Sequence, residues 1–175
     1  YQNNVAGSIS VIQCTQLLDN PCLVFSSTCA TYGIPDNADA ITERTPQCPV
    51  NPYGHSKLMV EQIITDTAST GRLQGVMLRY FNAAGCDPDG ELGECHSPET
   101  HVIPVLIDSV LHGQSFVING DQYPTPDGTA IRDYVHVCDL AQAHIQALEY
   151  LWSGGETSAF NLGTGTGTSV QQLID

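Results

Sequence analysis

Positive charge is the scarcest property of this chain. Its 175 residues include five lysine and arginine residues against 19 acidic ones, which gives a formal net charge of −14. Nucleic-acid binding depends on basic side chains that neutralise phosphates, and anionic lipid surfaces attract the same side chains. The chain is therefore expected to bind neither nucleic acid nor a membrane surface.

Long apolar segments and secretion signals are missing as well. No apolar run approaches the roughly 20 residues of a membrane span. No basic segment followed by an apolar one opens the chain. Seven cysteines are present without any C-x-x-C pair, and their odd number and wide spacing fit reduced thiols. These features favour a cytoplasmic protein.

The six histidines form no H-E-x-x-H motif. His136, Cys138 and Asp139 are close in sequence, but they match no spacing typical of metal ligands. No metal site is expected from the sequence.

The only lysine is Lys57, which follows Tyr53 by four residues. Pro52 suits the first turn of a helix, where its missing N–H costs nothing. Positions four apart lie on one face of a helix, so the phenol and the ammonium can point at one site. A phenol needs a pKa lowered by about 3 units, or about 4 kcal/mol, to act as a base near neutrality. A nearby cation has the right sign for that shift. The spacing fits an acid/base pair, and an exposed helix with a chance Tyr and Lys is the alternative.

Hydrophobic patterning predicts short buried strands that alternate with helices. The expected strands are 23–25, 76–78, 116–118 and 159–162. The expected helices are about 5–18, 52–70, 102–111 and 139–152, with a last one capped by Ser169. Loops are expected over 32–50 and 83–100, with a turn at 124–128. This alternation predicts a parallel α/β sheet.

Polar residues follow the first two expected strands. Ligands in parallel sheets bind beyond the carboxyl ends of the strands. Thr28 and the segment 80–82 fall there, and Tyr53 and Lys57 lie on the helix between the strands. We therefore expect these groups to meet. At least one of the two arginines in patterned segments, Arg79 and Arg132, is expected to contact an anionic ligand.

Seven runs in this order and spacing resemble the extended short-chain dehydrogenase/reductase family. They are Asn-Asn-Val-Ala-Gly at 3–7, Phe-Ser-Ser-Thr-Cys-Ala-Thr-Tyr-Gly at 25–33, the segment 51–61 with Tyr53 and Lys57, Leu-Arg-Tyr-Phe-Asn-Ala-Ala-Gly at 78–85, Asp-Gly-Thr at 127–129, Arg-Asp-Tyr-Val-His-Val at 132–137, and Asn-Leu-Gly-Thr-Gly at 161–165. Any one run is a weak motif, and the ordered set is a strong one.

The resemblance implies a partial Rossmann-like, doubly wound parallel sheet with an interleaved smaller substrate-binding α/β region. Residues 1–82 are expected to be the C-terminal part of the NAD-binding domain. Residues 83–175 are expected to be mostly the nucleotide-sugar region, interleaved with the remaining sheet elements. The N-terminal half with the family's G-x-x-G-x-x-G pyrophosphate turn is missing. Gly-Thr-Gly-Thr-Gly at 163–167 is interpreted as a strand-to-helix turn, not as its substitute. The chain is therefore expected to be an internal fragment of a longer enzyme, inactive by itself.

The activity that the resemblance implies is NAD-dependent 4-epimerisation of a UDP-hexose, between UDP-glucose and UDP-galactose, through a 4-keto intermediate. Tyr53 would be the acid/base, Lys57 would bind the nicotinamide ribose and lower the Tyr53 pKa, and Thr28 would hold the reacting hydroxyl. The implied NAD contacts are Asn3, Ser26, Tyr53, Lys57, Tyr80 and Phe81. The implied UDP-sugar contacts are Thr28, Cys29, Ala30, Asn82, Thr100, His101, Val102, Val117, Ile118, Asn119 and Arg132.

Sister activities stay open at this point. Related dehydratases place Asp-Glu directly after the threonine of the Thr28 position, and here Cys29 and Ala30 stand there. UDP-arabinose or UDP-xylose epimerases share the sequence Ser-Thr-Cys-Ala-Thr-Tyr-Gly of residues 27–33. Another nucleotide-sugar dehydrogenase of the family, or a non-catalytic remnant, is a further alternative. The resemblance also implies a homodimer as one alternative for the whole protein, since family members often pair through a helix bundle near the helix that starts at Pro52.

Overall fold

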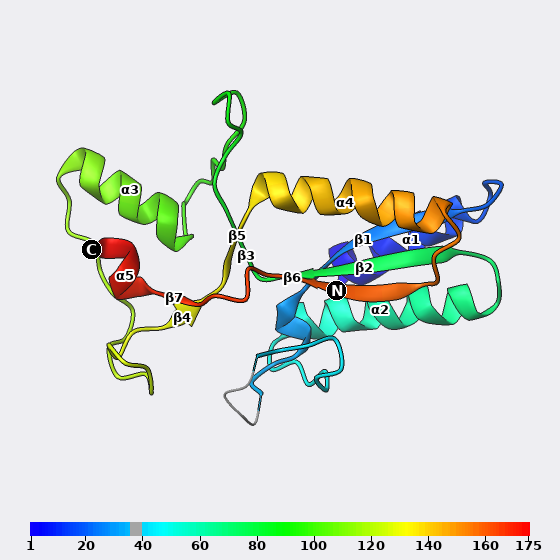
Figure 1. Ribbon diagram of the computed structural model, residues 1–175, viewed down its shortest axis with the longest axis horizontal. Helices are drawn as coiled ribbons and strands as arrows, with labels where there is room; N and C mark the ends of the chain where they lie inside the picture. The colour runs from blue at the N-terminus through cyan, green and yellow to red at the C-terminus, as the bar shows by residue number, and fades with distance from the viewer. Residues whose placement is uncertain (36–39) are drawn as a thin grey trace. The chain divides into compact units, whose positions relative to one another are not determined.

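The computed structural model describes residues 1–35 and 40–175 (Figure 1). It divides into two compact units. The first contains Tyr1–Phe81 and Leu140–Leu162, and the second contains Asn82–Asp139 and Gly163–Asp175. The part of the expected 32–50 loop that falls on residues 36–39 lies outside the described residues.

The first unit is built on a three-stranded parallel sheet. Its strands are β1 (Cys22–Thr28), β2 (Gln74–Tyr80) and β6 (Ser158–Leu162), in the order β1-β2-β6. Each contains an apolar run from which a strand was predicted, so the parallel α/β class is confirmed. The register pairs Thr28 with Tyr80, which brings the carboxyl ends of β1 and β2 to one edge of the sheet.

Helices cover both faces of this sheet. The π-helical turn η1 (Gln2–Ala6), α1 (Gly7–Thr15) and α2 (Pro52–Ser69) lie on one face, and α4 (Val137–Trp152) lies on the other (Figure 1). Two apolar clusters fill the layers between them. The buried members are Ile12, Val60, Ile64, Leu73 and Met77 on the α1/α2 side, and Val76, Leu78, Ala147 and Leu151 on the α4 side.

Two helix details differ from the prediction. The first helix was expected over 5–18, but α1 ends at Thr15, and Ile12 is buried while Ile9 and Leu17 are exposed. The fourth helix was expected to start at 139 but starts at Val137, so Asp139 lies in its first turn. A carboxylate in the first turn still stabilises the helix through its dipole.

A buried ion pair joins α2 to the centre of the sheet. Glu61 of α2 and Arg79 of β2 have relative exposures of 3% and 6%. Arg79 Nη2 lies 2.6 Å from Glu61 Oε2, and Arg79 Nε lies 3.0 Å from Glu61 Oε1. Arg79 Nη1 donates to the Tyr32 hydroxyl at 2.8 Å. Because Arg79 is buried and bonded to Glu61 and Tyr32, Arg132 is left as the arginine that can meet an anionic ligand, and that expectation stays a prediction.

The second unit contains short elements. β3 (Asn82–Ala84) pairs in parallel with β5 (Tyr134–His136), and β4 (Ile131–Arg132) pairs antiparallel with β7 (Thr168–Ser169). Its helices are α3 (Val102–His112) and α5 (Val170–Ile174). The strands of two or three residues were not predicted, because they are too short to show a period. The strand expected at 116–118 was wrong, since these described residues form no strand and Val117 is exposed.

The glycine-rich segment 163–167 is a turn, as predicted. Asp133 holds it: Oδ1 accepts the N–H of Thr164 and Oδ2 accepts the N–H of Gly165, both at 2.9 Å. The amides that a bound phosphate would need are therefore already occupied by a carboxylate. Ser169 then caps α5 in a capping box with Gln172, which confirms the expected start of the last helix.

Over residues 1–35 and 40–175, no helix has both the length and the apolar character that a membrane crossing requires. The seven cysteines all lie in these ranges and form no disulfide with one another.

The ion pair makes a stability prediction. Glu61→Gln removes the carboxylate and leaves the Arg79 guanidinium buried without its counter-charge, which costs about 3 kcal/mol or more. Urea unfolding should show this loss in the free energy of unfolding. Glu149→Gln on the exposed face of α4 is the control and should stay within about 0.5 kcal/mol of the parent chain. Equal losses of unfolding free energy in the two variants would contradict the stabilising role of the ion pair.

Candidate active site

The first turn of α2 positions Tyr53. Asn51 is the N-cap, and its side-chain oxygen accepts the N–H of Gly54 at 2.8 Å. A Cβ on Gly54 would lie 2.4 Å from the carbonyl oxygen of Ala30. Only glycine therefore lets α2 approach the short 3-10 helix η2 (Cys29–Thr31) this closely. The approach brings Tyr53, which is 51% exposed, to the carboxyl end of β1.

Thr28 meets Tyr53 at this edge. Thr28 is the last residue of β1, is buried, and accepts the N–H of Ala30 at 3.1 Å through its hydroxyl. Its side chain also lies close enough to the phenol of Tyr53 to act on the pKa of that group. The structure thus brings together two of the three residues predicted to be catalytic, on a rigid strand end and a helix first turn.

Lys57 lies one turn further along α2. Its Nζ donates to the carbonyl oxygen of Ser26 at 2.9 Å and lies 5.7 Å from the centroid of the Tyr53 ring. The ammonium also lies 4.8 Å from the centroid of the Phe25 ring. Burial lowers the pKa of Lys57, because removal from water disfavours the charged form.

The pKa of Tyr53 is raised, not lowered. Burial is the largest cause, while the hydrogen bond with Thr28 acts in the opposite direction and the nearby Tyr80 and Cys29 add to the rise. The expectation that Lys57 holds this pKa down is therefore not met in this geometry. The physical reason is the direction of the lysine: its Nζ is bonded to the Ser26 carbonyl and not to the phenol.

The other predicted cofactor contacts, except Asn3, lie in or directly after the last residues of β1 and β2. Ser26 Oγ lies 3.2 Å from His144 Nε2, and the ring of Tyr80 lies 6.1 Å from that of His144. Phe81 follows β2 directly and donates its N–H to the carbonyl oxygen of Leu162 at 3.2 Å. Asn3 is exposed on η1. Sequence reasoning missed His144, because a lone histidine inside a helix gives no signal of its own.

Asn4 was missed too. Its side-chain nitrogen donates to Ser56 Oγ at 2.9 Å, and Ser56 Oγ donates to the carbonyl oxygen of Tyr53 at 2.7 Å. These two bonds tie η1 to the first turn of α2. Asn4 stands beside Asn3 in the Asn-Asn-Val-Ala-Gly run, and only the folded structure distinguishes the two side chains.

The predicted UDP-sugar contacts fall in both units. Cys29 and Ala30 form η2 beside Tyr53 in the first unit. In the second unit, Asn82 starts β3 and Arg132 is exposed on β4, where its Nη1 donates to the carbonyl oxygen of Ile131 at 2.7 Å. The remaining members lie just before and at the start of α3 or in irregular chain, namely Thr100, His101, Val102, Val117, Ile118 and Asn119. Their convergence with Tyr53 stays a prediction.

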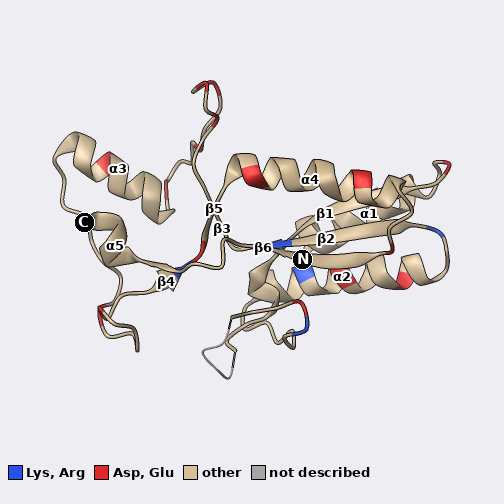
Figure 2. Ribbon diagram, viewed as in Figure 1, with Lys and Arg blue, Asp and Glu red and all other residues tan. Residues whose placement is uncertain are grey.

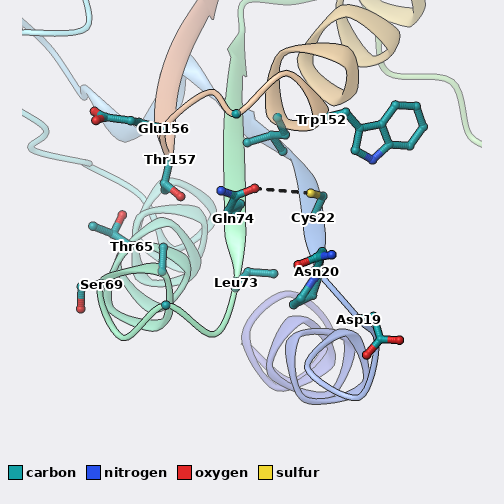
Figure 3. Close-up of a pocket in the computed structure, with 15 residues that line it drawn as sticks. Asp19, Asn20, Cys22, Thr65, Ser69, Leu73, Gln74, Trp152, Glu156 and Thr157 are labelled. Atoms are coloured by element: carbon teal, nitrogen blue, oxygen red, sulfur yellow. Dashed lines mark hydrogen bonds between the residues drawn. The ribbon is translucent and has the colours of Figure 1, made fainter.

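An open depression of about 1060 Å³ lies at the other end of the same sheet (Figure 3). It is lined by residues that precede the strands, such as Asn20, Leu73 and Glu156, and by the ends of α2 and α4. Cys22 donates to Gln74 across it at 3.8 Å. None of the predicted site residues lines it, so the predicted acid/base groups and this depression lie at opposite ends of the strands.

A parallel α/β unit with a Tyr-x-x-x-Lys helix beside a strand-end threonine is typical of the short-chain dehydrogenase/reductase class. Comparison with known proteins supports this assignment. Residues 1–163 match the NAD dependent epimerase/dehydratase family, and the chain belongs to this family. It is 51% identical to UDP-glucose 4-epimerase of Rhizobium leguminosarum bv. trifolii, over 99% of this chain and 53% of that protein.

Solved structures resemble the chain as closely. The crystal structure of UDP-glucose 4-epimerase from Brucella ovis in complex with NAD has a TM-score of 0.93 at 48% identity, over 99% of this chain and 54% of that one. UDP-glucose-4-epimerase from Stenotrophomonas maltophila with bound NAD and formylated UDP-arabinopyranose has a TM-score of 0.92 at 39% identity, over 99% and 52%. The chain spans about half the length of the curated relatives it matches.

The geometry predicts an alkaline titration for Tyr53. Because burial outweighs the hydrogen bond with Thr28, the phenol should ionise above its ordinary pKa of 10.0. The ultraviolet difference titration between the chain and Tyr53→Phe isolates this group, and far-ultraviolet circular dichroism over the same pH range checks that the chain stays folded. Lys57→Met should leave the midpoint almost unchanged. A midpoint below 10 that rises in Lys57→Met would show that the ammonium dominates after all.

Proposed function

We propose that this chain carries the acid/base centre of an enzyme that epimerises a UDP-hexose at C4 with NAD, between UDP-glucose and UDP-galactose. The single observation that carries the proposal is the meeting of Tyr53 and Thr28 at the carboxyl ends of β1 and β2, with Lys57 one turn away. The family membership and the names of the similar proteins support it. The activity belongs to a whole protein that includes this chain.

Tyr53 is the proposed proton acceptor and donor. Its phenol is half exposed, so a sugar hydroxyl can reach it, and the buried Thr28 side chain lies close to it. Thr28 can share a hydrogen bond with the same sugar hydroxyl and orient its proton toward Tyr53. Tyr53 would take up this proton as the C4 hydride leaves, which would give the 4-keto sugar. Return of both a hydride to the other face of C4 and the proton to its oxygen would complete the epimer.

NAD, when bound, supplies the hydride acceptor and donor. The residues present fit its nicotinamide-ribose end, because Lys57 and Ser26 place an ammonium and a hydroxyl at the strand ends beside Tyr53. Lys57 needs only to exchange the Ser26 carbonyl for a ribose hydroxyl to bind there. Once it has left the Ser26 carbonyl, its ammonium would also add positive potential near the phenol and favour proton removal.

The residues after Thr28 distinguish epimerisation from dehydration. Elimination of water needs a group that protonates the leaving hydroxyl, and carboxylic acids serve this purpose. Cys29 and Ala30 occupy η2 at this place, and neither side chain is a carboxylic acid. This favours the epimerase over the dehydratase reaction. Another nucleotide-sugar dehydrogenase activity of the family stays an alternative.

The identity of the sugar is less constrained. A UDP-hexose is proposed because the relatives named above are UDP-glucose 4-epimerases. A UDP-pentose, arabinose or xylose, is the second candidate, and the S. maltophila structure, which holds formylated UDP-arabinopyranose, favours keeping it. Asn82 and Arg132 are proposed to hold the diphosphate, since an arginine fork can pair with phosphate oxygens. A homodimer of the whole protein stays a prediction.

Replacement of the phenol tests the proposal. In an active protein that contains this chain, Tyr53→Phe should lower turnover at least about 100-fold, because acid/base catalysis commonly contributes that much. UDP affinity should hardly change. Tyr123→Phe, at an exposed tyrosine of the second unit, is the control and should keep full turnover. Turnover that survives in Tyr53→Phe would remove Tyr53 from the mechanism.

A non-catalytic role of the isolated chain is the alternative from another class. It is motivated by the missing G-x-x-G-x-x-G turn and by Asp133, which occupies the amides of the 163–167 turn. Isothermal titration of NAD and of UDP against the chain tests it. We expect no tight binding of NAD. Tight binding would refute the view that the dinucleotide site is incomplete within these 175 residues.

A further inference from the structure

Four potential ligand side chains converge in the segment that leads into α3. They are Glu94, His96, Glu99 and His101, and one donor atom of each lies within 4.8 Å of the other three. None of the proposed catalytic groups belongs to this cluster. This site was not predicted from the sequence, because the spacing E-x-H-x-x-E-x-H matches no common metal motif.

The two imidazoles point at the same carboxylate. His96 Nδ1 lies 2.9 Å from Glu94 Oε1, and His101 Nδ1 contacts the same oxygen. Glu99 closes the group, with its carboxylate oxygens 3.8 Å from His96 Nδ1 and 4.0 Å from His101 Nδ1. The two rings stand edge to face with centroids 5.2 Å apart, so they do not block each other.

These separations match the spacing of ligand atoms around one small cation. Zinc binds histidine nitrogen and carboxylate oxygen at about 2.0–2.2 Å, which places tetrahedral ligand atoms about 3.4 Å from one another. Three separations between a histidine Nδ1 and a glutamate oxygen, 2.9, 3.8 and 4.0 Å, lie on either side of that distance. Imidazole and carboxylate together suit zinc and its neighbours in the transition series, whereas calcium and magnesium prefer oxygen alone.

The backbone holds part of the cluster in place. Glu99 Oε1 accepts the N–H of Thr100 at 2.7 Å and the N–H of His101 at 2.9 Å. The carboxylates are less exposed than the rings, at 24% and 22% against 56% and 63%. An ion can therefore enter from solvent past the two histidines and meet carboxylates already fixed behind them.

We propose that Glu94, His96, Glu99 and His101 form a binding site for one divalent transition-metal ion of the zinc type. The ion would have a structural role, because it would hold residues 94–101 in one loop conformation directly before α3. Coordination through Nδ1 would also fix the ring of His101, next to Thr100 and Val102 among the proposed UDP-sugar contacts.

The test uses the 175-residue chain without a histidine tag and Co²⁺ as a spectroscopic probe for zinc. One Co²⁺ per chain should bind with visible d–d absorption, and Zn²⁺ should displace it. Glu94→Gln and His96→Ala each remove one ligand and should weaken binding at least about 10-fold. Both positions are exposed, so the fold should survive, and circular dichroism checks this.

His112→Ala is the matched control. His112 is an exposed histidine on α3 that faces Asp108 and lies outside the cluster. It should leave Co²⁺ affinity and spectrum unchanged. Absence of one-to-one binding in the parent chain, or an equal loss in His112→Ala and His96→Ala, would overturn the proposal.

Discussion

The buried pair of Glu61 and Arg79 is the interaction on which the sheet edge with Thr28 and Tyr53 depends. Arg79 stands in the middle of the sheet, and its guanidinium is held by a carboxylate of α2 and by the hydroxyl of Tyr32. The same carboxylate accepts a hydrogen bond from Ser27, the residue before Thr28. One charge pair thus fixes the end of β1, the helix with Tyr53 and the turn between them. Figure 2 shows how sparse the basic residues are. Arg79 is buried in the core, where it sets this geometry.

The electrostatics of the acid/base pair run against its proposed chemistry. Burial raises the pKa of Tyr53 and lowers that of Lys57, so both shifts favour the uncharged forms. A phenolate at neutral pH needs additional positive potential close to the ring. The Lys57 ammonium can provide part of it only when it leaves the Ser26 carbonyl. Ligand binding and proton transfer would then be coupled through one side chain, with the lysine as the moving part.

Long helices and strands were predicted from the sequence, because they contain enough apolar residues to show a period. Features that arise only from contacts between distant residues were missed. α2 and β2 have enough apolar residues to show their type, and both were found. The two-residue strands β4 and β7 were not, since they exist only through pairing. At the site, residue identity located Tyr53 and Thr28, because strand ends of a parallel sheet share an edge. The direction of the Lys57 side chain, and with it the sign of the Tyr53 pKa shift, could not be obtained without coordinates. The same holds for the partner of Arg79.

The two units are discontinuous in sequence, and this limits how the chain can be divided. The backbone passes from one unit to the other after Phe81, after Asp139 and after Leu162. A truncated chain that stopped at residue 82 would keep Tyr53 and Lys57 but lose β6 and α4. Val76 and Leu78 would then face water, and one edge of β2 would lack its neighbour. A shortened protein that keeps the first unit intact must therefore join residues 140–162 to residues 1–81, by circular permutation or through a linker.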